Sequence, residues 1–429
     1  MLIDPLTSNL CYVTPDIPGI GGTLKQRPAD FIVDEQPLYD PEGAGEHLYL
    51  YIEKEHQTTT DVVRRLAKMF GVKRRDIGYA GLKDKHAITR QHFSVWLPDA
   101  SHDEKFLKRF EFLPFRLIWS RRHANKLRRG HLKGNRFIIH VRDVDPARAV
   151  EVERYLAHLG AGVPNYLGHQ RFGYRQNNHL LGRHLIRHQW QALLDVMLGE
   201  NAAEEGVTTR GRQAYVENDY AGALDAWPRR MRHERQALDA LRQGKSPEEA
   251  VMAIDAGQRE FLVSAAQSDI FNQVVDRRLR VGGWTGLQQL AAGDLAWKHD
   301  NRAVFAVDET TARVENAPTG RVSTFEVSPS GPMWGAGMER ATGSVGEVEI
   351  QALAAAGLTT LDLDTTNPVP VYGARRPLRV PVTETDVSAG SDEDGPYIRL
   401  AFALPRGSYA TVVMREIMKV EKRDATRSP

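Results

Sequence analysis

The stretch GYAGLKDKHAITRQ, residues 78–91, combines the end of a strand with a charged loop. Small and apolar residues up to Gly81 predict a short strand, after which Asp84 is expected on an exposed turn between Lys83 and Lys85. An aspartate between two cations stays ionised at neutral pH, which suits a nucleophile or base acting at a glycosidic carbon or at its neighbour. The same residues are also typical of an ordinary surface loop, so the pattern alone leaves both interpretations open.

Strands and helices are predicted on both sides of this loop. Short apolar-alternating runs predict strands at DFIVDEQPL, HLYLYIEKE, HFSVWL and FIIHVRDV, which begin at residues 30, 47, 92 and 137. TTTDVVRRLAKMFGV predicts an amphipathic helix capped by Thr60 or Asp61 and ended by Gly71. A second helix is expected over PARAVEVERYLAHLG, residues 146–160. The first part of the chain is therefore expected to mix α and β structure.

The chain changes character after residue 162 and returns to strand-like text near its end. Residues 163–372 are expected to be an insertion, with a helical stretch from Trp190 to about Leu279 and an exit linker containing Pro368 and Pro370. The last residues predict strands over LRVPVTETDV and YIRLAFALP, then a helix over SYATVVMREIMKV. Such a C-terminal piece cannot fold alone. We expect one discontinuous α+β domain, residues 1–162 plus 373–429, interrupted by residues 163–372.

Length and composition restrict the class of protein. A chain of 429 residues is longer than the roughly 250 to 300 that one core usually supports, and 41% hydrophobic with 26% charged residues is typical of a globular protein. No apolar run approaches the roughly 20 residues of a membrane span, and Cys11, the single cysteine, cannot form an internal disulfide. The N-terminal residues show no secretory signal pattern, so a cytoplasmic location is expected.

Positive charge is concentrated although the formal net charge is only +2. Residues 116–136, RLIWSRRHANKLRRGHLKGNR, contain eight Lys or Arg and no acidic residue. A block of this kind attracts phosphate groups, and it is also typical of a solvated basic helix face. The sequence thus favours a nucleic-acid partner without excluding the second interpretation.

Other kinds of site have weaker support. His179, His184 and His188 could share a helix face, but no carboxylate or cysteine at useful spacing completes a metal site, and none is expected. The glycines of IPGIGGTLK match neither phosphate-loop pattern, and a plain turn before Lys25 is expected. No GxSxG motif is present, and Cys11 has no local partner pattern, so a serine or thiol hydrolase is not indicated.

Six ordered motifs resemble those of the TruD-type tRNA pseudouridine synthases. The loop is similar to the family pattern GxKDKxAxTxQ, and KQRPADFIVDE from Lys25 is similar to KxxPxDFxVxE. HANKLRRGHLKGNRF and PNYLGHQRFG follow, with Leu167 where the family pattern has Phe, which suggests a packing position. SDIFNQVV and LPRGSYATVVMREI complete the set, with Tyr409 where Phe is frequent.

This resemblance implies an RNA isomerase that converts uridine to pseudouridine at position 13 of certain transfer RNAs, without a cofactor. Asp84 takes the role of the catalytic aspartate, and the residues expected to hold the base are Phe31, Asn135 and Tyr409, with Phe137 and Lys25 as further candidates. The implied fold is a mixed, mainly antiparallel sheet flanked by helices, interrupted by an inserted α/β TRUD domain. A monomer without a metal or a membrane contact is expected.

The residues themselves are compatible with this chemistry. Extracting a uridine from its base stack costs a few kcal/mol of free energy. Stacking of the extracted base on an aromatic side chain contributes about 1 to 3 kcal/mol of favourable free energy. Without the resemblance, Phe31 and Phe137 are typical of core aromatics and Asn135 of a turn residue. The basic residues expected to follow the RNA backbone are Arg121, Arg122, Lys126, Arg128, Arg129 and Lys133. Arg171 and Arg175 could lie at the mouth of the site or brace the structure.

Three questions stay open at this level. Asp84 could attack C1′ of the ribose or remove a proton from C2′ to give a glycal, and the base that removes the C5 proton is not indicated. A non-catalytic RNA-binding protein or RNA chaperone is the alternative, although such a protein would not need an ionised carboxylate facing a phosphate-rich ligand. A metal-dependent nucleic-acid hydrolase is a third possibility, which activity in EDTA would exclude.

Overall fold

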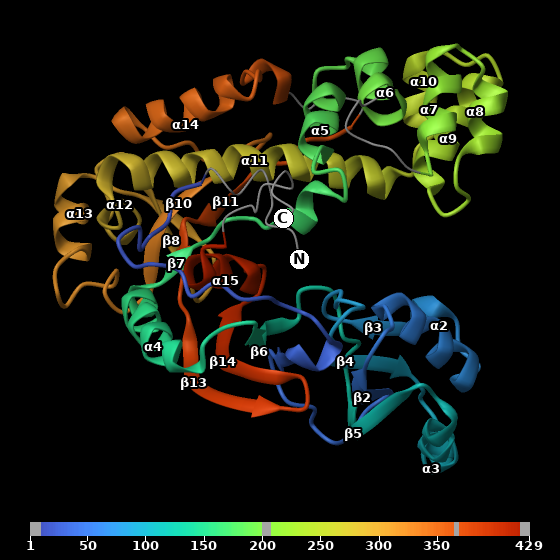
Figure 1. The fold of residues 1–429 in the computed structure, drawn as a ribbon, viewed down its shortest axis with the longest axis horizontal. Coiled ribbons are helices and arrows are strands. Elements are labelled where there is room, and N and C mark those ends of the chain that lie inside the picture. The colour runs from blue at the N-terminus through green and yellow to red at the C-terminus, as the bar shows by residue number, and fades with distance from the viewer. Residues whose placement is uncertain (1–9, 200–206, 364–368, 421–429) are drawn as a thin grey trace. The chain divides into compact units, whose positions relative to one another are not determined.

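The computed structural model describes residues 10–199, 207–363 and 369–420, and its chain divides into two compact units (Figure 1). Unit 1 contains Thr14–Val163 and the chain from Val380 onward. Unit 2 contains Pro164–Arg379 together with the N-terminal segment that ends at Val13. Across the described ranges, no helix has the length and apolar character needed to cross a membrane.

Among the described residues, the chain passes between the units after Val13 and again inside two short strands, β7 (Val163–Pro164) and β12 (Arg379–Val380). The boundaries expected from the sequence were 162 and 372, so the return to unit 1 comes seven residues later than expected, after Arg379. Of the two prolines of the expected exit linker, Pro370 lies in unit 2 and Pro368 lies outside the described residues. The assignment of unit 2 as a separately inserted family domain stays a prediction.

Unit 1 is built on one eight-stranded sheet with the order β13-β14-β6-β1-β4-β2-β5, in which β3 also pairs with β4. Its strands are β1 (Phe31–Pro37), β2 (His47–Lys54), β3 (Ile77–Tyr79), β4 (Ile88–Trp96), β5 (Phe115–His123), β6 (Leu132–Arg142), β13 (Thr383–Asp392) and β14 (Gly395–Pro405). Strands β1 and β4 run parallel, and the other neighbouring pairs run antiparallel. The predicted mixed, mainly antiparallel sheet flanked by helices is confirmed.

The helices of unit 1 are α2 (Thr59–Phe70), α3 (Asp103–Leu107), α4 (Ala149–His158) and α15 (Ala410–Met418). Helix α2 ends as predicted at Gly71, whose φ of 70° favours glycine. The predicted N-cap was wrong. Thr58 caps the helix, because its side chain accepts a hydrogen bond from Asp61 N at 3.1 Å while the Asp61 carboxylate accepts from Thr58 N at 3.1 Å.

The two larger hydrophobic cores among the described residues of unit 1 lie toward opposite ends of the strand order. One core joins α4 and α15 to β1, β6 and β14, and contains Phe31, Phe137 and Phe402. The other joins α2 to β2, β4 and β5 through residues such as Leu50 and Phe93. Strand β1 pairs with β6 on one side and with β4 on the other. The charged residues near the C-terminal end of β1 are therefore held between paired strands.

The basic block of residues 116–136 is not a helix. It forms most of β5, a connecting loop and the start of β6, so the helix-face interpretation is wrong. Asn135 lies inside β6, opposite Glu35 of β1 and Leu404 of β14, and is not a turn residue. Aromatic and β-branched residues farther along both segments favour strands there, which a charge count alone does not reveal.

Unit 2 is largely helical, with a small four-stranded sheet of order β11-β10-β8-β9. Its helices are α5 (Asn178–Ile186), α6 (Trp190–Leu198), α7 (Thr209–Val216), α8 (Tyr220–Ala226), α9 (Arg232–Arg242), α10 (Pro247–Met252), α11 (Ala256–Gly282), α12 (Thr285–Gln288), α13 (Glu309–Glu315) and α14 (Gly343–Ala355). Its strands are β8 (Leu295–Lys298), β9 (Val304–Ala306), β10 (Val327–Met333) and β11 (Ala374–Pro377).

Helix α11 forms the centre of unit 2 and packs against α5, α14 and β10 (Figure 1). Helix α5 approaches α11 so closely that a Cβ on Gly182 would lie 2.0 Å from Leu262 O. Asn272 of α11 accepts a hydrogen bond from Leu167 N at 2.8 Å and donates one to Leu167 O at 3.0 Å. Leu167 is itself buried, in agreement with the packing position expected for it.

Candidate active site

Asp84 lies in the loop that joins β3 to β4 in unit 1, and its side chain is 33% exposed. Lys25 Nζ lies 2.7 Å from Asp84 Oδ2, although the two residues are 59 positions apart in the chain. Lys25 has a φ of 57°, a left-handed conformation that few residues with side chains adopt. The loop therefore presents a carboxylate that is reachable from solvent and is paired with one cation.

The main chain of this loop is held by two buried side chains. Thr59, in the first turn of α2, accepts a hydrogen bond from Lys83 N at 3.0 Å. Gln91 of β4 donates from Nε2 to Gly81 O at 2.5 Å and accepts from the Thr59 hydroxyl at 3.0 Å. Because these groups belong to a helix and a central strand, the loop is fixed at points on either side of Asp84.

Lys54, at the end of β2, makes a third attachment. Its Nζ donates to Asp84 O at 3.0 Å and to Gln57 O at 2.7 Å, and the residue is only 1% exposed. Burial lowers the pKa of Lys54 to about 8, with the nearby Asp84 carboxylate acting in the opposite direction. A buried ammonium thus holds the main chain of the residue whose side chain faces solvent.

A buried chain of polar groups lies next to this loop. Lys83 Nζ lies 2.8 Å from Glu35 Oε2 and donates to Asn135 Oδ1 at 2.7 Å. Glu35 Oε1 also accepts from His92 N at 3.0 Å and lies 3.2 Å from His92 Nδ1. Burial alone would raise the pKa of Glu35, but Lys83 and His92 outweigh it and lower that pKa, so the carboxylate stays ionised.

The predicted aromatic residues occupy different environments. Phe31 is 3% exposed and lies under Lys25, whose Nζ is 4.1 Å from the ring centroid. Phe137 contacts Phe31 edge-on, with centroids 6.2 Å apart, and both rings belong to the core. Tyr409 is half-buried and precedes α15, directly beyond the end of β14 that pairs with Gly134. A continuous set of contacts thus runs from the Asp84 loop to Lys25, Phe31 and Phe137. Tyr409 lies after the end of β14, which pairs with β6, the strand that contains Phe137.

Comparison with known proteins identifies the family of this chain. The family model described as tRNA pseudouridine synthase D (TruD) matches residues 7–417. This chain belongs to the TruD family. The tRNA pseudouridine synthase D of Syntrophotalea carbinolica is 40% identical over 413 residues, covering 96% of this chain and 99% of that protein. The protein of the same name from Geobacter sulfurreducens is 41% identical, covering 95% and 96% of the two chains.

A solved structure gives the same result for the fold of this TruD-family chain. The crystal structure of the putative tRNA pseudouridine synthase D from Methanosarcina mazei matches with a TM-score of 0.80 and 27% sequence identity. The match covers 98% of this chain and 99% of that one. The six motifs that carried the resemblance therefore belong to a similarity that extends over nearly the whole chain.

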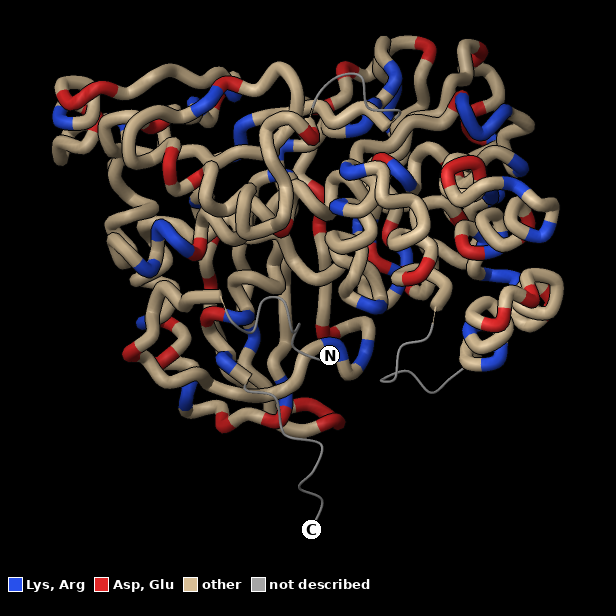
Figure 2. Tube along the Cα trace, turned by 90° about the horizontal axis from the view of Figure 1, so that it is seen from above, with Lys and Arg blue, Asp and Glu red and all other residues tan. Residues whose placement is uncertain are grey.

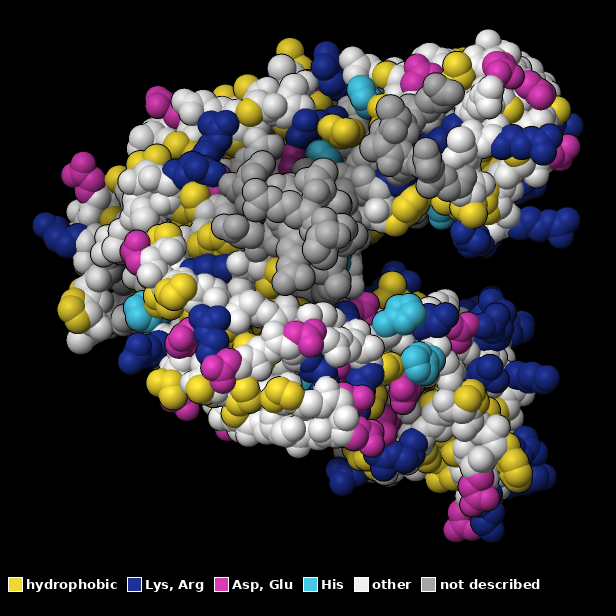
Figure 3. Space-filling view, viewed as in Figure 1, with side chains coloured by type: hydrophobic (Ala, Val, Ile, Leu, Met, Phe, Trp, Pro, Cys, Tyr) yellow, Lys and Arg dark blue, Asp and Glu magenta, His cyan; other side chains and the backbone are white. Residues whose placement is uncertain are grey.

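The six basic residues expected at the RNA backbone divide into two groups. Exposed side chains are those of Arg121, Arg128, Arg129 and Lys133. Arg122 instead pairs with Asp103 and donates to Leu97 O, and Lys126 donates to Arg75 O. Figure 3 shows Lys and Arg side chains gathered over the part of unit 1 that contains α2, β3 and β5, whereas Figure 2 shows basic and acidic residues interspersed over most of the chain. The four exposed residues are therefore the candidates for contact with the RNA backbone.

Two other sequence features have structural roles. Arg175 Nη1 donates to Val196 O at 3.0 Å and to Met197 O at 3.2 Å, which favours the bracing interpretation. His188 is stacked on Trp190, with ring centroids 5.0 Å apart, and His184 Nδ1 lies 2.9 Å from Gln189 Oε1. Within the three described ranges, His, Cys, Asp and Glu side chains form no group of three or more that could hold a metal ion.

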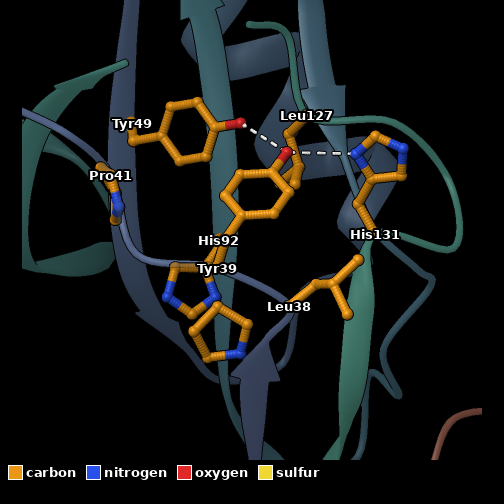
Figure 4. Close-up of a pocket in the computed structure, with 8 residues that line it drawn as sticks. Leu38, Tyr39, Pro41, Tyr49, His92, Leu127 and His131 are labelled. Atoms are coloured by element: carbon orange, nitrogen blue, oxygen red, sulfur yellow. Dashed lines mark hydrogen bonds between the residues drawn. The ribbon is translucent and has the colours of Figure 1, made fainter. Parts of the chain in front are cut away.

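A small pocket is lined by His92 together with Tyr39, Tyr49 and His131 (Figure 4). Tyr39 OH lies 3.3 Å from Tyr49 OH and 3.1 Å from His131 Nδ1, while Tyr49 OH donates to Asn125 O at 3.0 Å. Burial, followed by the contact with Tyr39, raises the pKa of Tyr49 far above its ordinary value. Because polar groups of its lining contact one another, we interpret the pocket as internal packing and not as a ligand site.

Sequence reasoning missed Lys54, and it gave no role to Thr59, to Glu35 or to Gln91. A signal for Lys54 was present, because Leu50, Ile52 and Lys54 alternate along β2 and the first two are buried. A lysine at an inward position of a strand is expensive to bury unless it has partners. That position is therefore a recognisable sign of a buried functional cation.

Proposed function

We propose that this TruD-family chain is a tRNA pseudouridine synthase that isomerises uridine to pseudouridine in tRNA, at position 13, with Asp84 as the acting carboxylate. The observation that carries the proposal is the Asp84 carboxylate, which is partly exposed and paired with Lys25 at 2.7 Å. It belongs to a loop whose main chain is hydrogen-bonded by Lys54 at Asp84 O, by Thr59 at Lys83 N and by Gln91 at Gly81 O. Such rigidity is what a group needs to meet a reacting atom in one geometry.

The reaction requires one glycosidic bond to break and another to form. Either Asp84 attacks C1′ while the C1′–N1 bonding electrons pass to the uracil, or it removes a proton from C2′ to give a glycal and the same uracil anion. The base then turns and C5 bonds to C1′. In the first route this breaks the bond between Asp84 and C1′, and in the second the proton taken from C2′ returns to C2′. The proton on C5 is then lost to a base, and N1 gains a proton. Lys25 supports both routes, because its charge lies 2.7 Å from the Asp84 carboxylate and stabilises that group while it is ionised.

The base must be held while it is detached from the sugar. Tyr409 is half-buried and can offer an aromatic face, and Asn135 can offer an amide to the polar edge of uracil. Phe31 and Phe137 are buried beneath Lys25, so we assign them to the apolar wall under the base. Stacking of about 1 to 3 kcal/mol is large enough to offset much of the cost of extracting the nucleotide.

A direct test uses tRNA that carries tritium at C5 of uridine. Formation of the new C5–C1′ bond releases that tritium to water, and nuclease mapping locates the product. We expect one tritium released per tRNA molecule, and pseudouridine at position 13. A tRNA with cytidine at position 13 is the matched control and should release none from that position. Binding of the uridine tRNA without any release would favour the alternative of a non-catalytic RNA-binding protein.

The exposed basic residues of β5, β6 and the connecting loop are proposed to contact the RNA backbone. The double variant Arg128→Ala/Arg129→Ala removes two exposed cations, so tRNA binding should weaken and the slope of log K against log salt should fall by about 1 to 2. Filter binding at several salt concentrations measures both quantities. Arg229→Ala/Arg230→Ala, an exposed pair in unit 2, is the charge-matched control. An equal slope for wild type and the first variant would place the basic segment away from the RNA.

The remaining expectations belong to the same proposal. A tRNA substrate suits a cytoplasmic enzyme, and we propose that the chain works there as a monomer. Neither point enters the chemistry assigned to Asp84.

A further inference from the structure

Lys83, the residue immediately before Asp84, makes contacts that the proposed reaction does not require. Its side chain is only 6% exposed, with Nζ 2.8 Å from Glu35 Oε2 and 2.7 Å from Asn135 Oδ1. Glu35 is 1% exposed and is held from its other side by His92. Lys85, the other lysine of the same loop, is exposed and forms none of these contacts.

These contacts determine which way the Asn135 amide faces. A lysine ammonium donates hydrogen bonds and cannot accept them, so the amide oxygen of Asn135 must lie toward Lys83. The opposite assignment would set the NH₂ group against the ammonium, which gives no hydrogen bond. In the described part of the chain, Asn135 Nδ2 makes no hydrogen bond. The amide is therefore fixed by Lys83 and offers a donor.

The position of Lys83 is in turn fixed by the sheet. Glu35 and Asn135 lie opposite each other on the neighbouring strands β1 and β6, and Lys83 Nζ contacts both side chains. Its main-chain nitrogen is bound to Thr59, as described above. A single loop thus carries the acting carboxylate and the cation that orients the amide, and a shift of this loop would move both.

We propose that Lys83 is a positioning residue that presents Asn135 as a hydrogen-bond donor to the C4 carbonyl oxygen of the target uracil. The inference rests on the proposed function and adds a basis for base selection. Uracil offers carbonyl oxygens at C2 and C4, whereas cytosine has an amino group at C4. A fixed donor that faces C4 pairs with uracil and opposes cytosine, because a donor facing another donor leaves both unpaired. A freely turning amide would accept either base.

The test compares Lys83→Met with Lys85→Met, which removes the same charge from the other side of Asp84. Each enzyme is assayed with tRNA whose target nucleotide is uridine, 2-thiouridine or 4-thiouridine, since sulfur is a weak hydrogen-bond acceptor. Wild type and Lys85→Met should both lose about tenfold in kcat/KM on the 4-thiouridine substrate and much less on the 2-thiouridine substrate. Lys83→Met should lose about tenfold on uridine and should no longer distinguish uridine from 4-thiouridine.

A second variant separates orientation from folding. Lys83→Met leaves the buried Glu35 carboxylate without its lysine, so Glu35→Gln/Lys83→Met, in which neither charge remains, is measured alongside it. We expect this double variant to keep wild-type thermal unfolding and tRNA affinity, and still to lose the thio discrimination. Retained discrimination in a folded Lys83→Met or double variant would overturn the proposal, as would a wild type that treats all three substrates alike. Absence of any turnover by the wild type on uridine would overturn the proposed function itself.

Discussion

Asp84→Asn should lower tritium release from C5-labelled tRNA by at least about a thousandfold, because an amide is neither the nucleophile nor the base that the reaction needs. The substitution keeps the shape of the side chain. It also keeps the bond from Lys54 Nζ, which goes to the main-chain oxygen of residue 84 and not to its carboxylate. The loop should therefore hold its position, and the affinity for tRNA should change by less than about threefold. Single-turnover release and filter binding measure the two quantities on one preparation.

Asp40→Asn is the matched control for this variant. Asp40 is an exposed aspartate of unit 1, and its replacement makes the same change of charge and shape. It should leave tritium release within about twofold of wild type. Similar release by wild type and Asp84→Asn would remove Asp84 from the reaction, whatever the family of the chain.

Gly134→Ala should destabilise unit 1 by about 3 kcal/mol or more, which is large for the addition of one methyl group. Gly134 lies in β6 beside Asn135 and opposite Pro405 of β14. A Cβ at this position would lie 2.2 Å from Leu404 O, a main-chain atom of a paired strand. That atom cannot move without disturbing the sheet, so the strands must separate. The midpoint of urea unfolding, followed by tryptophan fluorescence, should fall accordingly.

Gly160→Ala provides the comparison for this prediction. A Cβ on Gly160 would have no atom within 4 Å, so the same substitution should change stability by less than about 1 kcal/mol. Because Asn135 follows Gly134, the Gly134→Ala variant should also lose isomerase activity at temperatures where it stays folded. Equal midpoints for the two variants would mean that the sheet accommodates the methyl group.

Much of the local structure could be predicted because it depends on neighbouring residues. The apolar alternation of β1 and β2 and the Gly71 end of α2 follow from side-chain periodicity and from one backbone preference. The cap of α2 was misplaced because Thr58, Thr60 and Asp61 are all good capping residues. Only the reciprocal bonds between Thr58 and Asp61 distinguish them.

The structure of the basic segment, residues 116–136, could not be predicted from its local sequence. Its charge was evident, but a count of charges does not distinguish a helix face from an edge strand. Nor does it reveal that Arg122 and Lys126 are engaged by Asp103 and Arg75 O, while Arg128 and Arg129 stay exposed. Those outcomes depend on which segments of the chain come to lie beside β5 and the loop that follows it.

By itself, the sequence determined the family, the mixed fold and the carboxylate at the centre of the proposal, because six motifs kept their order and their residues along the chain. Only the tertiary structure decided which side chains surround that carboxylate. Lys25, Lys54 and Asn135 lie far from the KDK loop in the chain and meet it there because the sheet sets β1, β2, β4 and β6 in a particular order and register. Local preferences extend over a few residues, whereas strand order and register depend on how the whole sheet buries its apolar faces.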